Sequence, residues 1–111
     1  SHGDAAILKV QHWLQSTGAT DVSLTSMAER AGLEERTFLR RFRAATGLKP
    51  TEYCQHLRVG KARELLEYSN GTIDHIAWTV GYQDPGAFRV IFKKITGLTP
   101  SDYRARFGVS G

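Results

Sequence analysis

Cysteine and long apolar runs are scarce in this sequence, and their scarcity excludes several classes of protein. Cys54 is the single cysteine among 111 residues, so no internal disulfide framework can form and a reducing compartment such as the cytoplasm is expected. We expect Cys54 to fill space in the core. No apolar run approaches the ~18 residues needed to span a bilayer, and no basic segment followed by an apolar stretch opens the chain. The sequence therefore predicts a soluble protein that neither crosses a membrane nor is exported.

Patterns typical of metal sites and catalytic sites are also missing. His12, His56 and His75 lie far apart, without a Cys or carboxylate at ligand spacing, so we predict no metal. Neither a strained nucleophile turn nor a glycine-rich phosphate loop accompanies the serines and carboxylates. Trp13 and Trp78 stand at helical core spacing, and we expect both to pack in the interior rather than to stack on a ligand. The sequence predicts neither an enzyme nor a bound cofactor.

The length and the start of the chain bound its organisation. A chain of 111 residues falls in the range of one ordinary domain, so we expect one compact unit over residues 1–111. The chain begins without methionine, at Ser1-His2-Gly3. We therefore expect a cloning remnant or a segment cut from a longer polypeptide.

The chain repeats itself when it is shifted by about half its length. The segment 27–32, Met-Ala-Glu-Arg-Ala-Gly, matches 76–81, Ile-Ala-Trp-Thr-Val-Gly, at a shift of 49 residues. Beyond the glycine the shift becomes 50, because one residue has been added to the second turn. At that shift Phe38 meets Phe88, Phe42 meets Phe92, Thr46-Gly47-Leu48 meets Thr96-Gly97-Leu98, Pro50 meets Pro100 and Tyr53 meets Tyr103.

The periodicity of the chain is helical throughout, with apolar residues three and four positions apart, so the fold class is predicted to be all-α with about seven helices. Ser23 and Thr72 are expected to cap short helices that end at Gly32 and Gly81, where glycine suits a left-handed C-cap. Asp84-Pro85 makes a good start for a further helix, and Glu34 makes a weaker one. The other expected helices cover residues 4–17, 35–46, 85–96 and a segment from 100 that buries Tyr103 and Phe107.

Two of these helix pairs have the layout of a helix-turn-helix, in which the second helix enters the major groove of DNA. The units cover about 24–47 and 73–97. Between them, residues 50–69 are predicted to form one linker helix about 30 Å long at 1.5 Å per residue, and the segment Asn70-Gly71 ends it. The apolar face of this helix is expected to carry Tyr53, Cys54, Leu57 and Leu65.

The second helix of the first pair separates apolar from basic residues. Phe38, Phe42 and Ala45 share one side, and Arg36, Arg40 and Arg43 share the opposite side with Thr37. Arginines at this spacing can donate two hydrogen bonds to a guanine edge and can contact phosphates. A solvated charged face is the alternative interpretation, but the repeat and the turn favour DNA binding, as do the net charge of +4 and the pI of 9.5.

The corresponding helix of the second pair carries different exposed chemistry. Phe88, Ile91, Phe92 and Ile95 form its expected buried side. Gly86 and Val90 replace Arg36 and Arg40, and Lys93 keeps the charge of Arg43. We therefore expect the second unit to rely on phosphate contacts through Lys93, Lys94 and the helix start at Asp84-Pro85, with Arg89 as its best base reader and Val90 against a thymine methyl.

Five segments together resemble the signature of the AraC/XylS family of bacterial transcription regulators over nearly the whole chain. They are Ala-Glu-Arg-Ala-Gly-Leu, Arg-Thr-Phe-Leu-Arg-Arg-Phe, Thr-Gly-Leu-Lys-Pro, Val-Gly-Tyr-Gln-Asp-Pro-Gly-Ala-Phe-Arg and Thr-Gly-Leu-Thr-Pro-Ser-Asp-Tyr-Arg. The resemblance implies homeodomain-like repeats whose two recognition helices address neighbouring major grooves of double-stranded DNA. The second and fourth segments resemble a subgroup with an amidotransferase-like N-terminal domain.

The resemblance also implies which positions face the bases, and which partners lie outside this chain. The family joins this domain to a separate effector or dimerisation domain, and in the full-length cytoplasmic protein RNA polymerase is an expected partner. Apolar Leu39 and small Gly86 depart from the polar residues common at their positions. The implied base-facing residues are Arg36, Thr37, Leu39 and Arg40 in the first recognition helix, and Pro85, Gly86, Arg89 and Val90 in the second.

Two other functions are weaker interpretations of the same sequence. A helical protein-interaction module would favour exposed apolar patches over basic helices. Proteins that bind single-stranded RNA with sequence specificity usually present exposed aromatic rings for stacking, whereas the phenylalanines here fall on the expected buried sides. Neither alternative explains the repeat.

Overall fold

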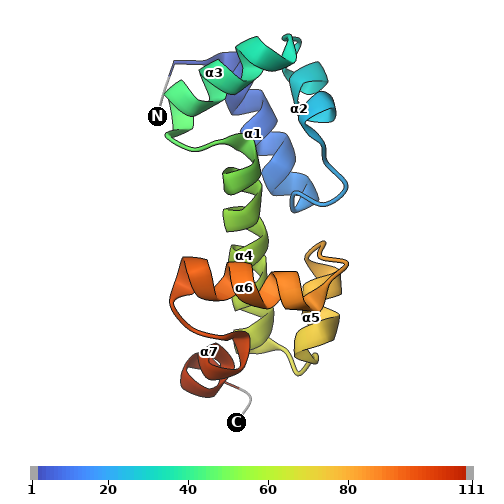
Figure 1. The fold of residues 1–111 in the computed structure, drawn as a ribbon, viewed down its shortest axis with the longest axis vertical. Helices are drawn as coiled ribbons and strands as arrows, with labels where there is room; N and C mark the ends of the chain where they lie inside the picture. The colour runs from blue at the N-terminus through green and yellow to red at the C-terminus, as the bar shows by residue number, and fades with distance from the viewer. Residues whose placement is uncertain (1–2, 110–111) are drawn as a thin grey trace. The chain divides into compact units, whose positions relative to one another are not determined.

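The computed structural model describes residues 3–109, and every regular element in that range is an α-helix, which confirms the predicted all-α class (Figure 1). Helical periodicity in the sequence is therefore a faithful guide to this fold. The seven helices are α1 (Ala5–Thr17), α2 (Leu24–Ala31), α3 (Glu35–Thr46), α4 (Pro50–Tyr68), α5 (Ile73–Thr79), α6 (Pro85–Thr96) and α7 (Pro100–Phe107).

The chain divides into two compact units, of which unit 1 ends at Gln55 and unit 2 begins at His56, so the boundary lies inside α4. The expectation of one compact unit is therefore wrong. The reason is that the buried residues of α4 fall into two sets: Cys54 is buried within unit 1, whereas Val59 belongs to the core of unit 2. Each unit has about 55 residues, which is near the lower limit for a stable hydrophobic core.

In unit 1, α1 packs against both α2 and α3. The Phe38 and Phe42 rings of α3 are fully buried and lie 5.5 Å apart between centroids, and the Tyr53 ring packs nearly perpendicular to Phe42 with centroids 5.4 Å apart. Aromatic pairs at such distances add to the stabilisation from burial. The other buried core residues of unit 1 include Ile7, Val10 and Leu14 of α1, Met27 and Ala28 of α2, and Cys54, as expected for that cysteine.

Unit 2 repeats this core with its own residues. Phe88 and Phe92 of α6 are fully buried with ring centroids 5.6 Å apart, and the Tyr103 ring packs nearly perpendicular to Phe92 with centroids 5.5 Å apart. Phe107 lies against Tyr103 with tilted rings and centroids 4.8 Å apart but stays 47% exposed, so its predicted burial is only partly met. The remaining members of this core are Val59, Ala62, Leu66, Ile76, Ala77 and Val80.

One arginine of α7 closes the C-terminal end of α4 in unit 2. The last carbonyl groups of any α-helix lack intrahelical donors, and the guanidinium of Arg104 supplies donors to this end. It donates to the carbonyl oxygens of Leu65 at 3.5 Å, Leu66 at 3.1 Å, Ser69 at 3.1 Å and Gly71 at 2.6 Å.

Candidate nucleic-acid interface

In unit 1 both ends of α2 are capped, and the cap at its C-terminal end begins the turn to α3. Ser23 caps α2 as predicted, because its hydroxyl accepts from the backbone N–H of Ser26. Gly32 ends α2 in the left-handed conformation at φ 71°, which suits a residue without Cβ. The Thr25 hydroxyl then donates to the Glu35 carboxylate at 2.8 Å, which joins the first turns of α2 and α3. The predicted weak start of α3 is confirmed, since Glu34 makes no side-chain capping bond.

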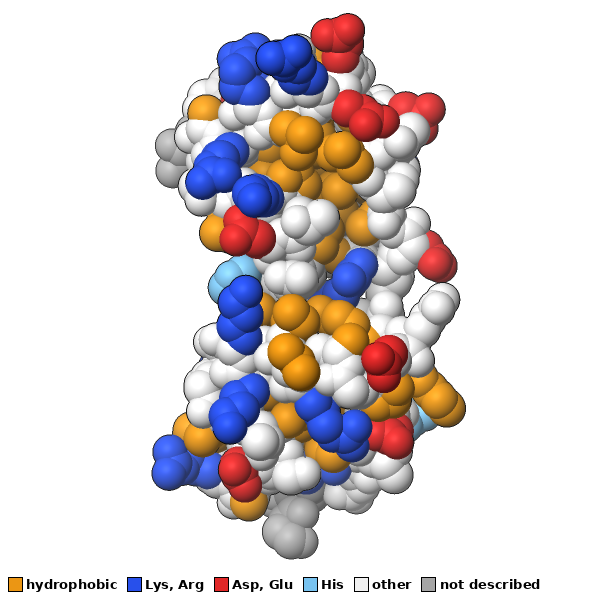
Figure 2. Space-filling view, in the orientation of Figure 1, with side chains coloured by type: hydrophobic (Ala, Val, Ile, Leu, Met, Phe, Trp, Pro, Cys, Tyr) orange, Lys and Arg blue, Asp and Glu red, His pale blue; other side chains and the backbone are white. Residues whose placement is uncertain are grey.

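α3 buries one side and exposes a basic one. Phe38 and Phe42 face the core, whereas Arg36, Arg40 and Arg43 are exposed. Figure 2 shows Lys and Arg side chains gathered over the part of unit 1 that α3 occupies. A basic side on the second helix of a helix-turn-helix can reach the bases and phosphates of a major groove.

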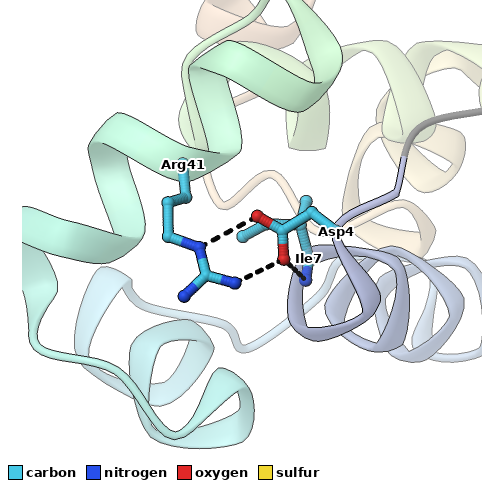
Figure 3. Close-up of polar contacts among 3 residues, drawn as sticks. All are labelled: Asp4, Ile7 and Arg41. Atoms are coloured by element: carbon cyan, nitrogen blue, oxygen red, sulfur yellow. Dashed lines mark hydrogen bonds and ion pairs between the residues drawn. The ribbon is translucent and has the colours of Figure 1, made fainter.

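A fourth arginine of α3 is engaged within unit 1 instead. The guanidinium of Arg41 donates through Nε to Asp4 Oδ2 at 2.9 Å and through Nη2 to Asp4 Oδ1 at 2.7 Å (Figure 3). Asp4 also caps α1 by accepting from the backbone N–H of Ile7 at 3.3 Å. The hydrogen bond from Arg41 is the main reason that the pKa of Asp4 is lowered. The pair fixes the start of α1 to the middle of α3.

In unit 2 the turn between α5 and α6 has stronger caps. Thr72 caps α5 as predicted, and α5 ends at Thr79 with Val80 as its cap. Gly81 has a positive φ of 106° but stands one residue beyond that cap, so its predicted place as the C-cap itself is wrong by one residue. The Asp84 carboxylate accepts from the backbone N–H of Gly86 at 2.9 Å, and Pro85 opens α6.

α6 also exposes basic groups, three as on α3, but two of them are lysines. Lys93 and Lys94 are exposed in its last turn, and Val90 is 67% exposed. Figure 2 shows Lys and Arg side chains over the part of unit 2 that α6 occupies. Arg89 is exposed and forms an ion pair with Asp74 of α5, with Nη2 and Oδ1 2.8 Å apart. No feature of the sequence pattern pointed to this pair or to the Arg41–Asp4 pair.

The site residues predicted from the sequence lie on the outer sides of α3 and α6. Ala45, Ile91 and Ile95, which were expected on the buried sides, are half-buried at the margins of the two cores. Two of the predicted contact residues, Thr37 and Pro85, are half-buried. The nine exposed ones are Arg36, Leu39, Arg40 and Arg43 of α3, and Gly86, Arg89, Val90, Lys93 and Lys94 of α6.

The two tryptophans differ from their expected places. Trp78 is 62% exposed, so its predicted core role is wrong. The short helix α5 turns Ile76 and Ala77 inward, its cap Val80 is also buried, and Trp78 is left on the outside. Trp13 is half-buried, with the Arg30 guanidinium 4.6 Å above its ring centroid.

The described part of the chain lacks the features of a metal site and of a membrane span. Residues 3–109 contain no group of three or more His, Cys, Asp or Glu side chains placed to hold a metal ion. None of the helices within the same range is both long enough and apolar enough to cross a bilayer.

Two short helix pairs, each joined by a tight turn and each exposing a basic second helix, define a helix-turn-helix protein. A family model described as a helix-turn-helix domain matches residues 27–106. The chain belongs to this family, the helix-turn-helix domains of the AraC/XylS regulators.

Similar proteins agree with this assignment. The chain is 36% identical over 101 residues to the HTH-type transcriptional activator RhaS of Escherichia fergusonii, a match that covers 91% of this chain and 36% of RhaS. RhaS of Salmonella newport is 33% identical over 104 residues, which are 94% of this chain and 37% of that protein. The chain thus spans little more than a third of the length of these curated relatives.

Two solved structures are similar over almost the whole chain. The DNA-binding domain of AdpA, solved in complex with a target DNA, is 33% identical with a TM-score of 0.87, and 92% of each chain is covered. The C-terminal domain of AraT, a response regulator from Geobacillus stearothermophilus, is 27% identical with a TM-score of 0.92, and the match covers 99% of this chain and 92% of that one.

Proposed function

We propose that residues 1–111 form the DNA-binding domain of a bacterial transcription regulator, and that α3 and α6 enter neighbouring major grooves of double-stranded DNA. The observation that carries the proposal is the exposed basic side of the second helix in two successive helix-turn-helix units. The AdpA domain, which has the same fold, was solved with a target DNA. The regulators among the relatives support a role in transcription rather than an enzymatic one.

The two recognition helices are proposed to divide the work unequally. α3 offers Arg36, Arg40 and Arg43, each with a guanidinium that can bind a guanine edge or a phosphate. At the matching positions α6 offers Gly86, Val90 and Lys93, so it keeps one of the three charges. Sequence specificity is therefore expected to come mainly from unit 1, whereas unit 2 adds phosphate contacts and a base contact from Arg89.

Selection of bound duplexes from a random pool tests the proposal directly. We expect one enriched sequence with two short blocks about one helical turn apart, one for each recognition helix. Enrichment of single-stranded RNA over duplex DNA at one salt concentration, or no enrichment at all, would reject the proposal.

The salt dependence of binding is a second, independent measurement. Lys and Arg side chains that neutralise phosphates release condensed counterions, so affinity for duplex DNA should fall steeply as salt rises from about 50 to about 200 mM. A flat dependence contradicts an interface made of basic side chains. The expected partners outside this chain are RNA polymerase and an effector or dimerisation domain, and the expected location is the bacterial cytoplasm, at the nucleoid when DNA is bound.

A further inference from the structure

Arg89 differs from the other predicted DNA contacts because an acidic side chain holds it. Its Nη2 lies 2.8 Å from Oδ1 of Asp74, which stands in the first turn of α5, and both side chains are about half exposed. Among the predicted contact residues, which all lie in the described range, Arg89 is the one that forms an ion pair. The pair therefore joins the first helix of the helix-turn-helix to a base-facing position of the second.

Unit 1 contains neither member of this pair. Thr25 stands at the position of Asp74, and Leu39 stands at the position of Arg89. Thr25 instead donates to Glu35 at the start of α3. The link between the two helices thus recurs in both units, but only in unit 2 does it end on a residue predicted to read a base.

The stability of the fold does not account for the pair. Exposed ion pairs contribute little to stability, because solvent screens them and two long side chains must be held in one geometry. A carboxylate near the DNA-facing side also repels phosphates and so weakens binding to any sequence. Asp74 is therefore expected to lower general affinity for DNA, and an advantage that offsets this repulsion would come from its effect on Arg89.

The hydrogen-bonding capacity of arginine shows what that advantage is. A guanidinium has five N–H donors, of which Asp74 uses one on Nη2. A second edge with two parallel donors remains for O6 and N7 of a guanine. A free arginine side chain loses considerable rotamer freedom when it is fixed in that geometry. An arginine that Asp74 already holds loses less rotamer freedom when it binds the guanine.

We propose that Asp74 is a positioning residue for DNA recognition, which holds Arg89 so that this arginine reads a guanine at one base pair of the second half-site. The proposal rests on the proposed function, because it needs a duplex that the chain selects. It adds a specificity determinant that lies outside both recognition helices.

The test compares base preference in four proteins, which are the wild type, Asp74→Asn, Arg89→Ala and the double variant. Dissociation constants are measured at one salt concentration on the selected duplex, on a scrambled duplex, and on duplexes with each base pair of the second half-site replaced in turn. Glu64→Gln is the matched control, because it removes one negative charge from another exposed ion pair of unit 2, Lys61–Glu64.

Asp74→Asn should reduce the preference for guanine at one base pair by about threefold to tenfold, which is part of the discrimination that a bidentate arginine provides. On the scrambled duplex the same variant should bind about as tightly as the wild type or up to about twofold more tightly, since a repelling charge has gone. Arg89→Ala should remove the preference at the same base pair, and adding Asp74→Asn to it should cause no further loss there. Asp74→Glu, which keeps the carboxylate, should restore part of the preference.

Three results would overturn the proposal. Asp74→Asn could raise affinity equally on every duplex, as is expected of the control Glu64→Gln, which would mean that Asp74 only repels DNA. It could increase the preference at the base pair, which would mean that Asp74 masks Arg89. It could also leave every preference unchanged while lowering the melting temperature, which would mean that its charge serves only the start of α5. A wild-type chain that does not distinguish selected from scrambled duplex would reject the proposed function as well.

Discussion

Units 1 and 2 share a core plan but differ in the polar groups that support it. At a shift of 52 residues, Ile7, Val10 and Leu14 of α1 correspond to Val59, Ala62 and Leu66 of α4, and all six are buried. The second part of α4 therefore does in unit 2 what α1 does in unit 1. The first turns of α4 correspond to α7 at a shift of 50 residues, since Pro50 matches Pro100 and Tyr53 matches Tyr103. A single helix thus completes one core and begins the next.

The tyrosine of each unit illustrates the difference. In unit 1 the Tyr53 hydroxyl accepts from Gln15 Nε2 at 3.1 Å. In unit 2 the Tyr103 hydroxyl donates to the carboxylate of Glu67, the counterpart of Gln15, and accepts from Arg63 Nε at 3.0 Å. Burial and the bond to Glu67 raise the pKa of Tyr103 despite the nearby Arg63. The neutral Gln15–Tyr53 contact of unit 1 thus corresponds to a contact with charged partners, Glu67 and Arg63, in unit 2. The repeat therefore preserves the apolar core more strictly than the polar groups around it.

The largest expected effects come from the matched core rings. Phe42→Ala and Phe92→Ala should each lower the free energy of unfolding by about 3–5 kcal/mol, because each removes a fully buried ring and leaves a cavity. Urea unfolding measures the loss, and amide hydrogen exchange shows which unit opens. We expect faster exchange mainly in the mutated unit. Equal acceleration in both units for either variant would contradict the division of the chain at α4.

Arg104 and Cys54 occupy matching positions with unlike roles. Arg104→Met should cost about 2–3 kcal/mol, since several carbonyl oxygens at the end of α4 lose a charged donor. Cys54→Ala should cost only about 1 kcal/mol, as for an ordinary small change in a core. Thermal unfolding of the two variants compares them. Losses of the same size would mean that Arg104 contributes no more than packing.

The unequal recognition helices are compared through Arg40 and Lys93. Arg40→Ala should weaken binding to the selected duplex by about 1–3 kcal/mol and relax the preference at one base position. Lys93→Ala should weaken binding to all sequences alike and lower the slope of affinity against salt by about one unit. Dissociation constants on selected and scrambled duplexes at several salt concentrations distinguish the two roles. If Arg40→Ala causes equal losses on both duplexes, Arg40 contacts phosphate only.

The smallest expected effect is an acid-side pH dependence of stability that comes from the Asp4–Arg41 pair of unit 1. Unit 2 cannot form such a pair, because Ile91 stands at the position of Arg41. Because Arg41 lowers the folded-state pKa of Asp4, the carboxylate stabilises the fold above its ordinary pKa of about 3.9, and this stabilisation is lost as the pH falls through the lower folded value. Asp4→Asn, which keeps an N-cap residue, should therefore lose less melting temperature than the wild type between about pH 6 and pH 3. Asp21→Asn is the control and should behave like the wild type.

The features predicted from the sequence are those that short segments encode. The repeat aligned Phe38 with Phe88 in the sequence. Helical spacing predicted that both side chains face the core, because burial along a helix follows a period of 3.6 residues, and both are buried. The capping roles of Ser23 and Thr72 follow from the residue type and its position. These local rules are sufficient for the helices, the turns and the basic sides of α3 and α6.

The features that were missed depend on distances that spacing cannot supply. Asp4 and Arg41 are 37 residues apart, and Asp74 and Arg89 are 15 apart, so each pair meets only when whole helices pack. Trp78 was expected inside because its spacing fits an apolar side, but the short helix α5 can bury only one narrow side. The division of α4 between two cores likewise depends on packing partners rather than on the helix itself.

The contrasting surroundings of the two tryptophans let fluorescence report on unit 1 separately from unit 2. Trp13, half-buried beneath the Arg30 guanidinium, belongs to unit 1, and Trp78, largely surrounded by water, belongs to unit 2. Unfolding of unit 1 transfers the Trp13 indole from a partly apolar site to water, which moves its emission to longer wavelength. Trp78 already emits from water in the folded state. A change in emission colour during unfolding therefore reports unit 1, without any added label.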